Sequence, residues 1–213
     1  MNYLGHFLLA SLAPETDREA YIVGGLLGDF VKGPLQTAQP VETAIDDDFR
    51  EQLINGIALH RHIDARFDHS EGFNFVRQTC PKDLRRYAGI MIDLTFDNLL
   101  ANQWAELFDD ELEEFSRGIV AVLVKHMPLC PARAKRLTTV FDEYDLLSRY
   151  REKDVVEQTL SRIGLRLNAP RLESASSHLW SIQEALAPKL DSTLASMQDI
   201  ARAFIASRAD PIA

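Results

Sequence analysis

Apolar residues recur every three or four positions along almost the whole chain, and the strict alternation typical of β-strands is almost absent. Prolines and glycines divide this pattern into segments of ordinary helical length. No repeat, low-complexity segment or linker interrupts the 213 residues. The sequence therefore predicts an all-α fold, a helical bundle formed by one domain over residues 1–213.

The periodic segments and their stop signals place the expected helices. We expect them at residues 3–13, 16–31, 48–67, 72–79, 81–104, 111–125, 131–147, 152–165 and 173–206. Residues 34–42 show no period and predict a loop long enough to cover a site. From residue 207 onward we expect a frayed tail.

The charge of the chain argues against two kinds of partner. A formal net charge of -9 is opposite to the basic footprint of a protein that binds nucleic acid or an anionic membrane. The two cysteines, Cys80 and Cys130, form neither a disulfide framework nor a thiolate zinc motif, which fits a reducing cytoplasm. The apolar N-terminal segment lacks the positive leader of a secretory signal, so we expect a core helix there and a cytoplasmic protein.

Two pairs of possible metal ligands have the spacing of one helical turn. His60 and Asp64 form the first pair, and Asp93 and Asp97 form the second. Side chains four residues apart project from the same helix face, so each pair makes a two-pronged chelating edge. Two facing edges could hold a divalent cation. Either pair alone is more typical of a solvated face or a surface ion pair.

Two further polar residues lie among apolar neighbours, at Asp29 and His6. Each alone could be a satisfied core residue, but together with the two pairs they indicate a common pocket because buried carboxylates need a partner or a metal. Three small residues precede Asp29: Gly24, Gly25 and Gly28. They indicate either close helix packing or room for a metal or phosphate.

Several familiar catalytic motifs are missing from the sequence. It contains no phosphate-binding glycine loop followed by Lys-Ser or Lys-Thr, no dinucleotide fingerprint and no Gly-x-Ser-x-Gly elbow. Covalent nucleophilic catalysis is therefore disfavoured. Carboxylate and imidazole ligands suit Mn²⁺, with Mg²⁺ or Fe²⁺ as alternatives, better than a structural zinc site.

Four segments in order carry a family resemblance: MNYLGH at residues 1–6, GLLGDFVKG at 25–33, GIALHRHID at 56–64 and DLTFD at 93–97. Their combination resembles the acyl carrier protein phosphodiesterase family. The resemblance implies an all-α fold, distantly similar to the HD-type metal-dependent phosphohydrolases. It also implies removal of the 4′-phosphopantetheine arm from holo acyl carrier protein, with manganese as the usual metal and no nucleic-acid or membrane partner.

Residue chemistry and the resemblance together suggest roles for the candidate site residues. The expected metal ligands are Asp29, His60, Asp64 and Asp93, and the expected proton handlers or additional ligands are His6 and Asp97. Arg61 and Lys32 could stabilise the phosphate oxygens or could be surface cations. His62 lies about 200° around the helix from His60, so we expect it, like His69, to be exposed.

Docking and two alternative functions complete the expectations. Arg85 and Arg86 should start the helix that carries Asp93 and could bind an acidic carrier protein; the basic stretch at 149–171 is the second choice. The family has histidine where this chain has Asn98, and a neutral amide cannot exchange a proton near neutral pH. A catalytically silent carrier-protein binding module therefore stays open, as does an HD-like hydrolase of a nucleotide or small phosphoester.

Overall fold

The computed structural model describes residues 1–35 and 45–209, and every regular element among them is helical, which confirms the predicted all-α class. The α-helices are α1 (Tyr3–Ala10), α2 (Arg18–Leu27), α3 (Asp47–Phe67), α4 (Glu71–Thr79), α5 (Ala88–Asn102), α6 (Trp104–Leu107), α7 (Leu112–His126), α8 (Ala132–Tyr144), α9 (Leu146–Arg149), α10 (Lys153–Arg166), α11 (Pro170–Glu173), α12 (Ser176–Leu186) and α13 (Leu190–Ala209). Short 3₁₀ turns are η2 (Arg85–Tyr87), η3 (Met127–Leu129) and η4 (Ala187–Lys189). The loop predicted at 34–42 lies outside the described residues after its first two positions.

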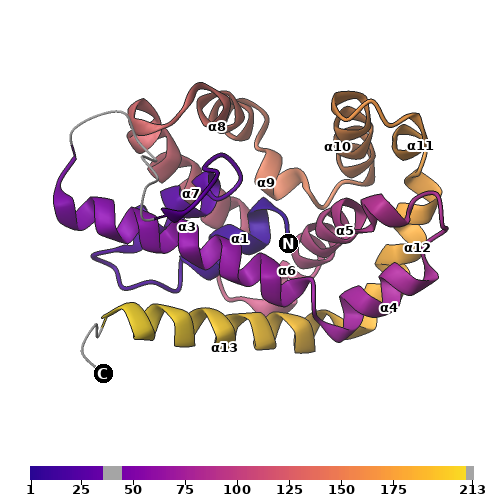
Figure 1. Cartoon of the computed structure of the whole chain (residues 1–213), viewed down its shortest axis with the longest axis horizontal. Coiled ribbons are helices and arrows are strands. Elements are labelled where there is room, and N and C mark those ends of the chain that lie inside the picture. The colour runs from indigo at the N-terminus through magenta and orange to yellow at the C-terminus, as the bar shows by residue number, and fades with distance from the viewer. Residues whose placement is uncertain (36–44, 210–213) are drawn as a thin grey trace.

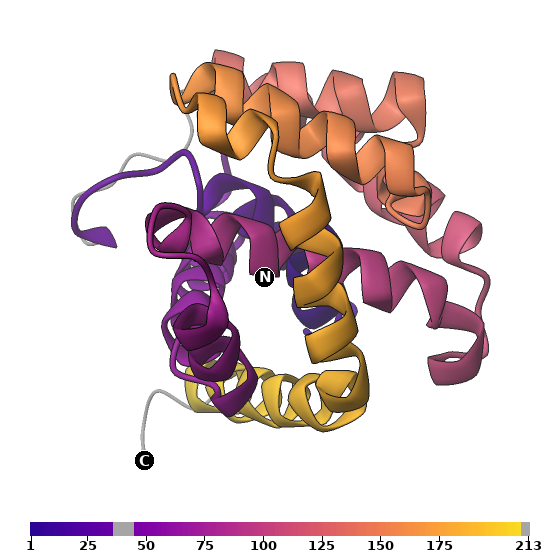
Figure 2. The same cartoon turned by 90° about the vertical axis from the view of Figure 1, so that its right-hand side faces the viewer.

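Helix α5 runs through the middle of the molecule. Figures 1 and 2 show α8 and α10 on one side of α5 and the long α13 on the other. Helices α1, α4, α10 and α12 contact α5, while α13 lies along α3. This arrangement brings α1, α3 and α5 together from distant parts of the sequence.

Helix α1 is a core helix, as the N-terminal segment predicts. All its residues from Leu4 to Ala10 are buried, including His6. Its apolar side chains join one hydrophobic cluster that extends through α2, α3, α5 and α13. A polar group carried by α1 is therefore held rigidly inside the core, where it needs a partner.

Helices α2 and α3 cross with their backbones in close contact. A Cβ atom added to Gly24 would lie 2.6 Å from the carbonyl oxygen of Leu53 and 2.7 Å from the Cα of Gly56. At Gly28 an added Cβ would lie 2.2 Å from Cγ of His60. Gly24 therefore serves helix packing, and Gly28 leaves room for a candidate site residue. Close packing therefore explains both glycines, and room for a metal or phosphate beside Asp29 stays a prediction.

Three predicted helices are interrupted in the structure. The segment at 81–104 begins with turns, so α5 starts only at Ala88 and α6 is separate. Asp145 adopts a left-handed conformation with φ 46° and separates α8 from α9. Pro188 lies in η4 and divides the predicted helix at 173–206 into α12 and α13, since proline lacks the backbone donor that a continuous helix needs.

Three helices also end at residues that differ from the expected ones. Helix α1 stops at Ala10 because the backbone N–H groups of residues 12 and 13 donate to carbonyl oxygens three residues back, and not four as in an α-helix. Helix α2 stops at Leu27, so Asp29 lies in the turn after it. Helix α13 extends to Ala209, beyond the predicted start of fraying. None of the described helices is long and apolar enough to cross a membrane.

Candidate metal centre

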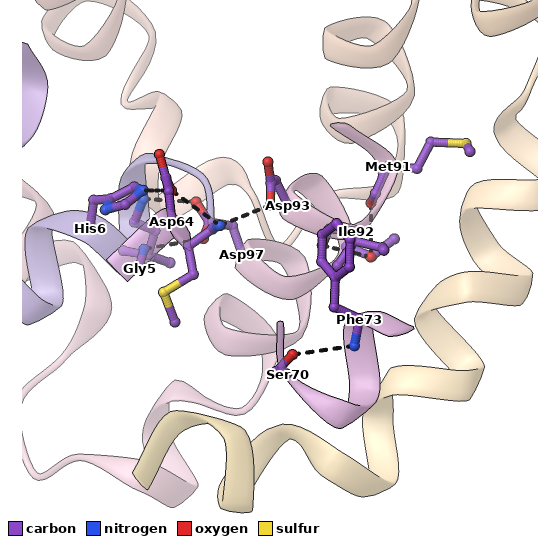
Figure 3. Close-up of polar contacts among 12 residues, drawn as sticks. Gly5, His6, Asp64, Ser70, Phe73, Met91, Ile92, Asp93 and Asp97 are labelled. Atoms are coloured by element: carbon purple, nitrogen blue, oxygen red, sulfur yellow. Dashed lines mark hydrogen bonds and ion pairs between the residues drawn. The ribbon is translucent and has the colours of Figure 1, made fainter. Parts of the chain in front are cut away.

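His6 of α1 and His60 and Asp64 of α3 meet at one point. The His6 Nε2 atom lies 2.9 Å from Oδ1 of Asp64, and the His60 Nε2 atom lies 3.2 Å from Oδ2 of the same carboxylate. The two imidazole rings stack with centroids 3.8 Å apart. Figure 3 shows His6 and Asp64 pointing toward one another from their two helices.

Burial shifts the pKa values of His6 and Asp64 in this cluster. Desolvation and the neighbouring His60 together hold the pKa of His6 at about 4, although Asp64 acts in the opposite direction. Burial opposes the ionisation of Asp64, but hydrogen bonds from His6 and His60 outweigh it and lower the pKa of this carboxyl. Near neutral pH the site therefore offers a neutral His6 imidazole and an ionised carboxylate, which are the protonation states that bind metals.

The Met1 ammonium group lies between Asp64 and Asp93 of α5. Met1 N donates a hydrogen bond of 2.8 Å to Oδ1 of Asp93 and lies 3.9 Å from Oδ1 of Asp64. Burial raises the pKa of Asp93, and the ammonium group opposes this rise. The described structure thus already places one positive charge between the two carboxylates.

Asp97 has a different environment from the other acids. Its carboxylate is fully buried and accepts hydrogen bonds from the backbone N–H groups of Leu4, at 2.7 Å, and Gly5, at 3.1 Å. Burial raises its pKa to about 7, against the opposing effects of the ammonium group and these backbone bonds. Asp97 therefore anchors the start of α1 on α5, which positions His6 (Figure 3).

Asp29 approaches the cluster from the turn after α2. Its Oδ1 atom lies 3.8 Å from His60 Nε2, and its side chain is exposed. Burial raises the pKa of Tyr3, and Asp29 reinforces that shift. Asp29 thus lies at the edge of the cluster and outside the group of three residues whose ligand atoms meet.

The donor set fits a divalent cation. One ligand atom each from His6, His60 and Asp64 lies within 4.8 Å of the others. The Nδ1 atom of His60 is buried without a hydrogen-bond partner among the described residues. Two imidazoles and a carboxylate, with Asp29 and Asp93 nearby, match the mixed nitrogen and oxygen ligands of Mn²⁺ or Fe²⁺.

Arg61 and Lys32 are placed away from this donor set. The Arg61 guanidinium donates to the carbonyl oxygens of Val31, at 2.7 Å, and Gly33, at 2.9 Å. It therefore ties the segment after α2 to α3. Lys32 is exposed on that segment, and neither residue is among the described residues that line the cavity beside the cluster.

A cavity of about 920 Å³ opens beside the cluster. Its polar lining includes Asp29, His60, Asp64 and Asp93, together with Arg86, Arg133, Arg136 and Arg166. Arg85 is not among the described lining residues. The arginines of α8 were not predicted as site residues, and Arg166 of α10 was covered only by the second-choice basic stretch at 149–171. The only signal for them in the sequence is an Arg-x-x-Arg pair and a basic stretch, which are common on solvated helices.

Asn98 does not take part in the cluster. It is only 1% exposed, and its amide donates a hydrogen bond of 2.8 Å to the carbonyl oxygen of Tyr150. This bond ties α5 to the turn between α9 and α10. The Asn98 side chain is therefore committed to the fold, and the sequence-based expectation that it replaces an acid–base group stays a prediction.

The remaining histidines are explained by local packing. His62 is partly buried, not exposed as predicted, because its ring lies beside that of Phe204 in α13, with centroids 5.2 Å apart. His69 is exposed, as predicted. His126 bonds Glu19, an acidic partner contributed by α2 that lies far away in the sequence.

Comparison with known proteins gives a consistent result. The family described as acyl carrier protein phosphodiesterase matches residues 1–197. Proteins named acyl carrier protein phosphodiesterase are similar to the chain in Klebsiella pneumoniae subsp. pneumoniae (33% identical over 175 residues, 82% of each chain) and Escherichia coli O45:K1 (31% over 175 residues, 82% of each). The relative from Yersinia enterocolitica serotype O:8 is 28% identical over 189 residues, 88% of this chain and 89% of its own. No solved structure matches significantly.

Proposed function

Because the chain belongs to the acyl carrier protein phosphodiesterase family, we propose that it hydrolyses the phosphodiester that joins 4′-phosphopantetheine to holo acyl carrier protein. The products are apo acyl carrier protein and free phosphopantetheine. The observation that carries this proposal is the convergence of His6, His60 and Asp64, of which His60 and Asp64 line an open cavity. The proposed metal is Mn²⁺, with Mg²⁺ or Fe²⁺ as alternatives.

Some of the site residues would bind the metal, and Asp97 positions one of these ligands. His6, His60 and Asp64 would bind the ion, and Asp29 and Asp93 are close enough to complete its ligand set. Asp97 fixes the position of His6 through the start of α1. When bound, a divalent cation acts as a Lewis acid on a phosphoryl oxygen and lowers the pKa of a water molecule.

The cavity supplies the second requirement, which is room for the substrate. Apolar side chains line it beside the polar cluster: Phe30, Phe73, Ile90, Leu94, Leu137, Leu146 and Ile163. A flexible arm with methylene groups and amides can lie against such a wall while its phosphate faces the cluster. Cation side chains in the same wall favour an anionic substrate.

Asn98 bears on one alternative function. A catalytically silent binding module was suggested only by the amide at this position, and the amide bonds Tyr150 instead of facing the site. A hydrolase of a nucleotide or small phosphoester would use the same donor set, so substrate tests must distinguish it.

The proposed reaction is tested by the intact mass of the carrier protein. Purified enzyme with Mn²⁺ is incubated with holo carrier protein, and the mass should fall by that of the whole phosphopantetheine group, leaving an unmodified serine. Apo carrier protein, which lacks the scissile bond, serves as the control and should keep its mass. Retention of phosphate on the serine, or hydrolysis of free nucleotides alone, would contradict the proposal.

A further inference from the structure

Three arginines that line the cavity have no hydrogen-bond or ion-pair partner among the described residues. Arg133 and Arg136 project from α8 and Arg166 from α10, and all three are exposed. None of them forms a hydrogen bond or ion pair with any residue in 1–35 or 45–209. A fourth lining arginine, Arg86 of η2, lies over the ring of Tyr87 at 4.4 Å from its centroid.

Several other arginines are paired with carboxylates, although Arg162 of α10, like the three lining arginines, forms no ion pair with a described residue. Arg149 pairs with Glu152 at 2.9 Å, and Arg151 pairs with Glu113 at 2.7 Å. Arg171 pairs with Asp83 at 3.0 Å. With 32 acidic residues against 23 basic ones, carboxylates are plentiful. Unpaired arginines on two helices that line one cavity therefore mark a place where anions from outside can bind.

One phosphodiester does not carry enough negative charge to pair with all the arginines that line the cavity. That group carries a single negative charge, and the metal cluster faces it from the cavity wall. Four guanidinium groups around the same cavity can pair with additional carboxylates. The end of α10 also presents apolar surface, since Leu165 and Leu167 are 64% and 47% exposed, although neither lines the cavity. Exposed apolar surface near charged groups contributes to a protein contact and gives little to a small anion.

We propose that Arg133, Arg136 and Arg166 form the docking surface for a carboxylate-bearing face of the carrier protein, next to the serine that carries the arm, with Arg86 at the inner edge. This inference rests on the proposed function and assigns its protein-recognition residues. The surface attracts the acidic face of the substrate, while the metal ligands act only on the phosphodiester. Arg85, favoured from the sequence, is not part of this surface.

A matched pair of variants on α10 tests the docking surface. Arg166→Glu reverses a charge at the cavity, and Arg162→Glu makes the same change one turn earlier at an exposed position that is not among the described lining residues. The binding of apo carrier protein is measured by calorimetry, so that no reaction takes place. Arg166→Glu should weaken binding by at least about tenfold, as expected for a lost contact between charged groups, and Arg162→Glu should bind like wild type.

Kinetics with holo carrier protein give a second readout that a structural defect would not imitate. Arg166→Glu and the double variant Arg133→Glu/Arg136→Glu should raise KM far more than they lower kcat, because docking is equal in the ground and transition states. Arg166→Lys keeps the charge and should recover most of the affinity. Added salt should weaken wild-type binding more than binding by the double variant.

The outcomes separate this inference from the proposed function. If wild type cleaves holo carrier protein but Arg166→Glu and the double variant bind apo carrier protein unchanged, only the docking surface is refuted. Equal losses in Arg166→Glu and Arg162→Glu would also refute it, since net charge alone would explain them. If wild type binds apo carrier protein through these arginines but leaves the holo form intact, the docking surface stands and the proposed reaction is refuted.

Discussion

At the scale of single residues, burial decides what each polar side chain can do. Desolvation holds the pKa of His6 well below neutrality and so leaves a ring nitrogen free to bind a cation. Asp97 is also buried, and its role is structural because both its carboxylate oxygens accept hydrogen bonds from backbone N–H groups of α1. Helical spacing predicts that two residues share a face. It does not predict whether that face meets backbone donors or an open cavity, and for this reason the bonds of Asp97 to the backbone of α1 were not predicted.

Asn98 offers a test at this scale. Asn98→Ala removes the donor to the buried Tyr150 carbonyl and should lower the free energy of unfolding by about 1–3 kcal/mol. Asn102→Ala, one turn later on α5, removes an exposed amide that water can replace and should cost less. Denaturant unfolding measures both. Turnover per folded molecule should stay near wild type, and a loss comparable to that of His60→Ala would show that the amide acts in the chemistry.

At the scale of elements, the crossing of α2 and α3 places His60 beside Asp29. Gly24→Ala would push a methyl group into the backbone of α3, so we expect a loss of about 1–3 kcal/mol in the free energy of unfolding. Gly118→Ala is the matched control, because nothing lies within 4 Å of its added Cβ on the exposed side of α7. It should stabilise the protein by up to about 1 kcal/mol. Equal effects in thermal unfolding would contradict the close-packing explanation.

Most helices could be predicted because their apolar periods and stop signals are local. Helices α3, α7 and α10 begin and end within one residue of the expected positions. The break at Asp145 could not be predicted, since its left-handed backbone is held by contacts from Ser116 and Ser148 that depend on the tertiary fold. The delayed start of α5 likewise follows from the turns that precede it, which no period reveals.

At the scale of the whole molecule, the site exists because three distant helices meet. The sequence could predict that His6, His60, Asp64 and Asp93 belong together, since polar groups in apolar helices need common partners. It could not predict which face of α8 or α10 lies opposite them. Arg133 and Arg136 were therefore missed, and Arg166 was covered only by the basic stretch at 149–171, although all three line the same cavity as the cluster.

The account as a whole depends on a cation bound by His6, His60 and Asp64, and a titration of metal-free protein with Mn²⁺ tests it most directly. Electron paramagnetic resonance should show tight binding by wild type and by His62→Ala, whose side chain contacts α13, but not by His60→Ala. Turnover of holo carrier protein should rise with bound Mn²⁺ and be at least about a hundredfold lower in His60→Ala. Unchanged Mn²⁺ binding by His60→Ala, or full turnover by the metal-free wild type, would contradict the account.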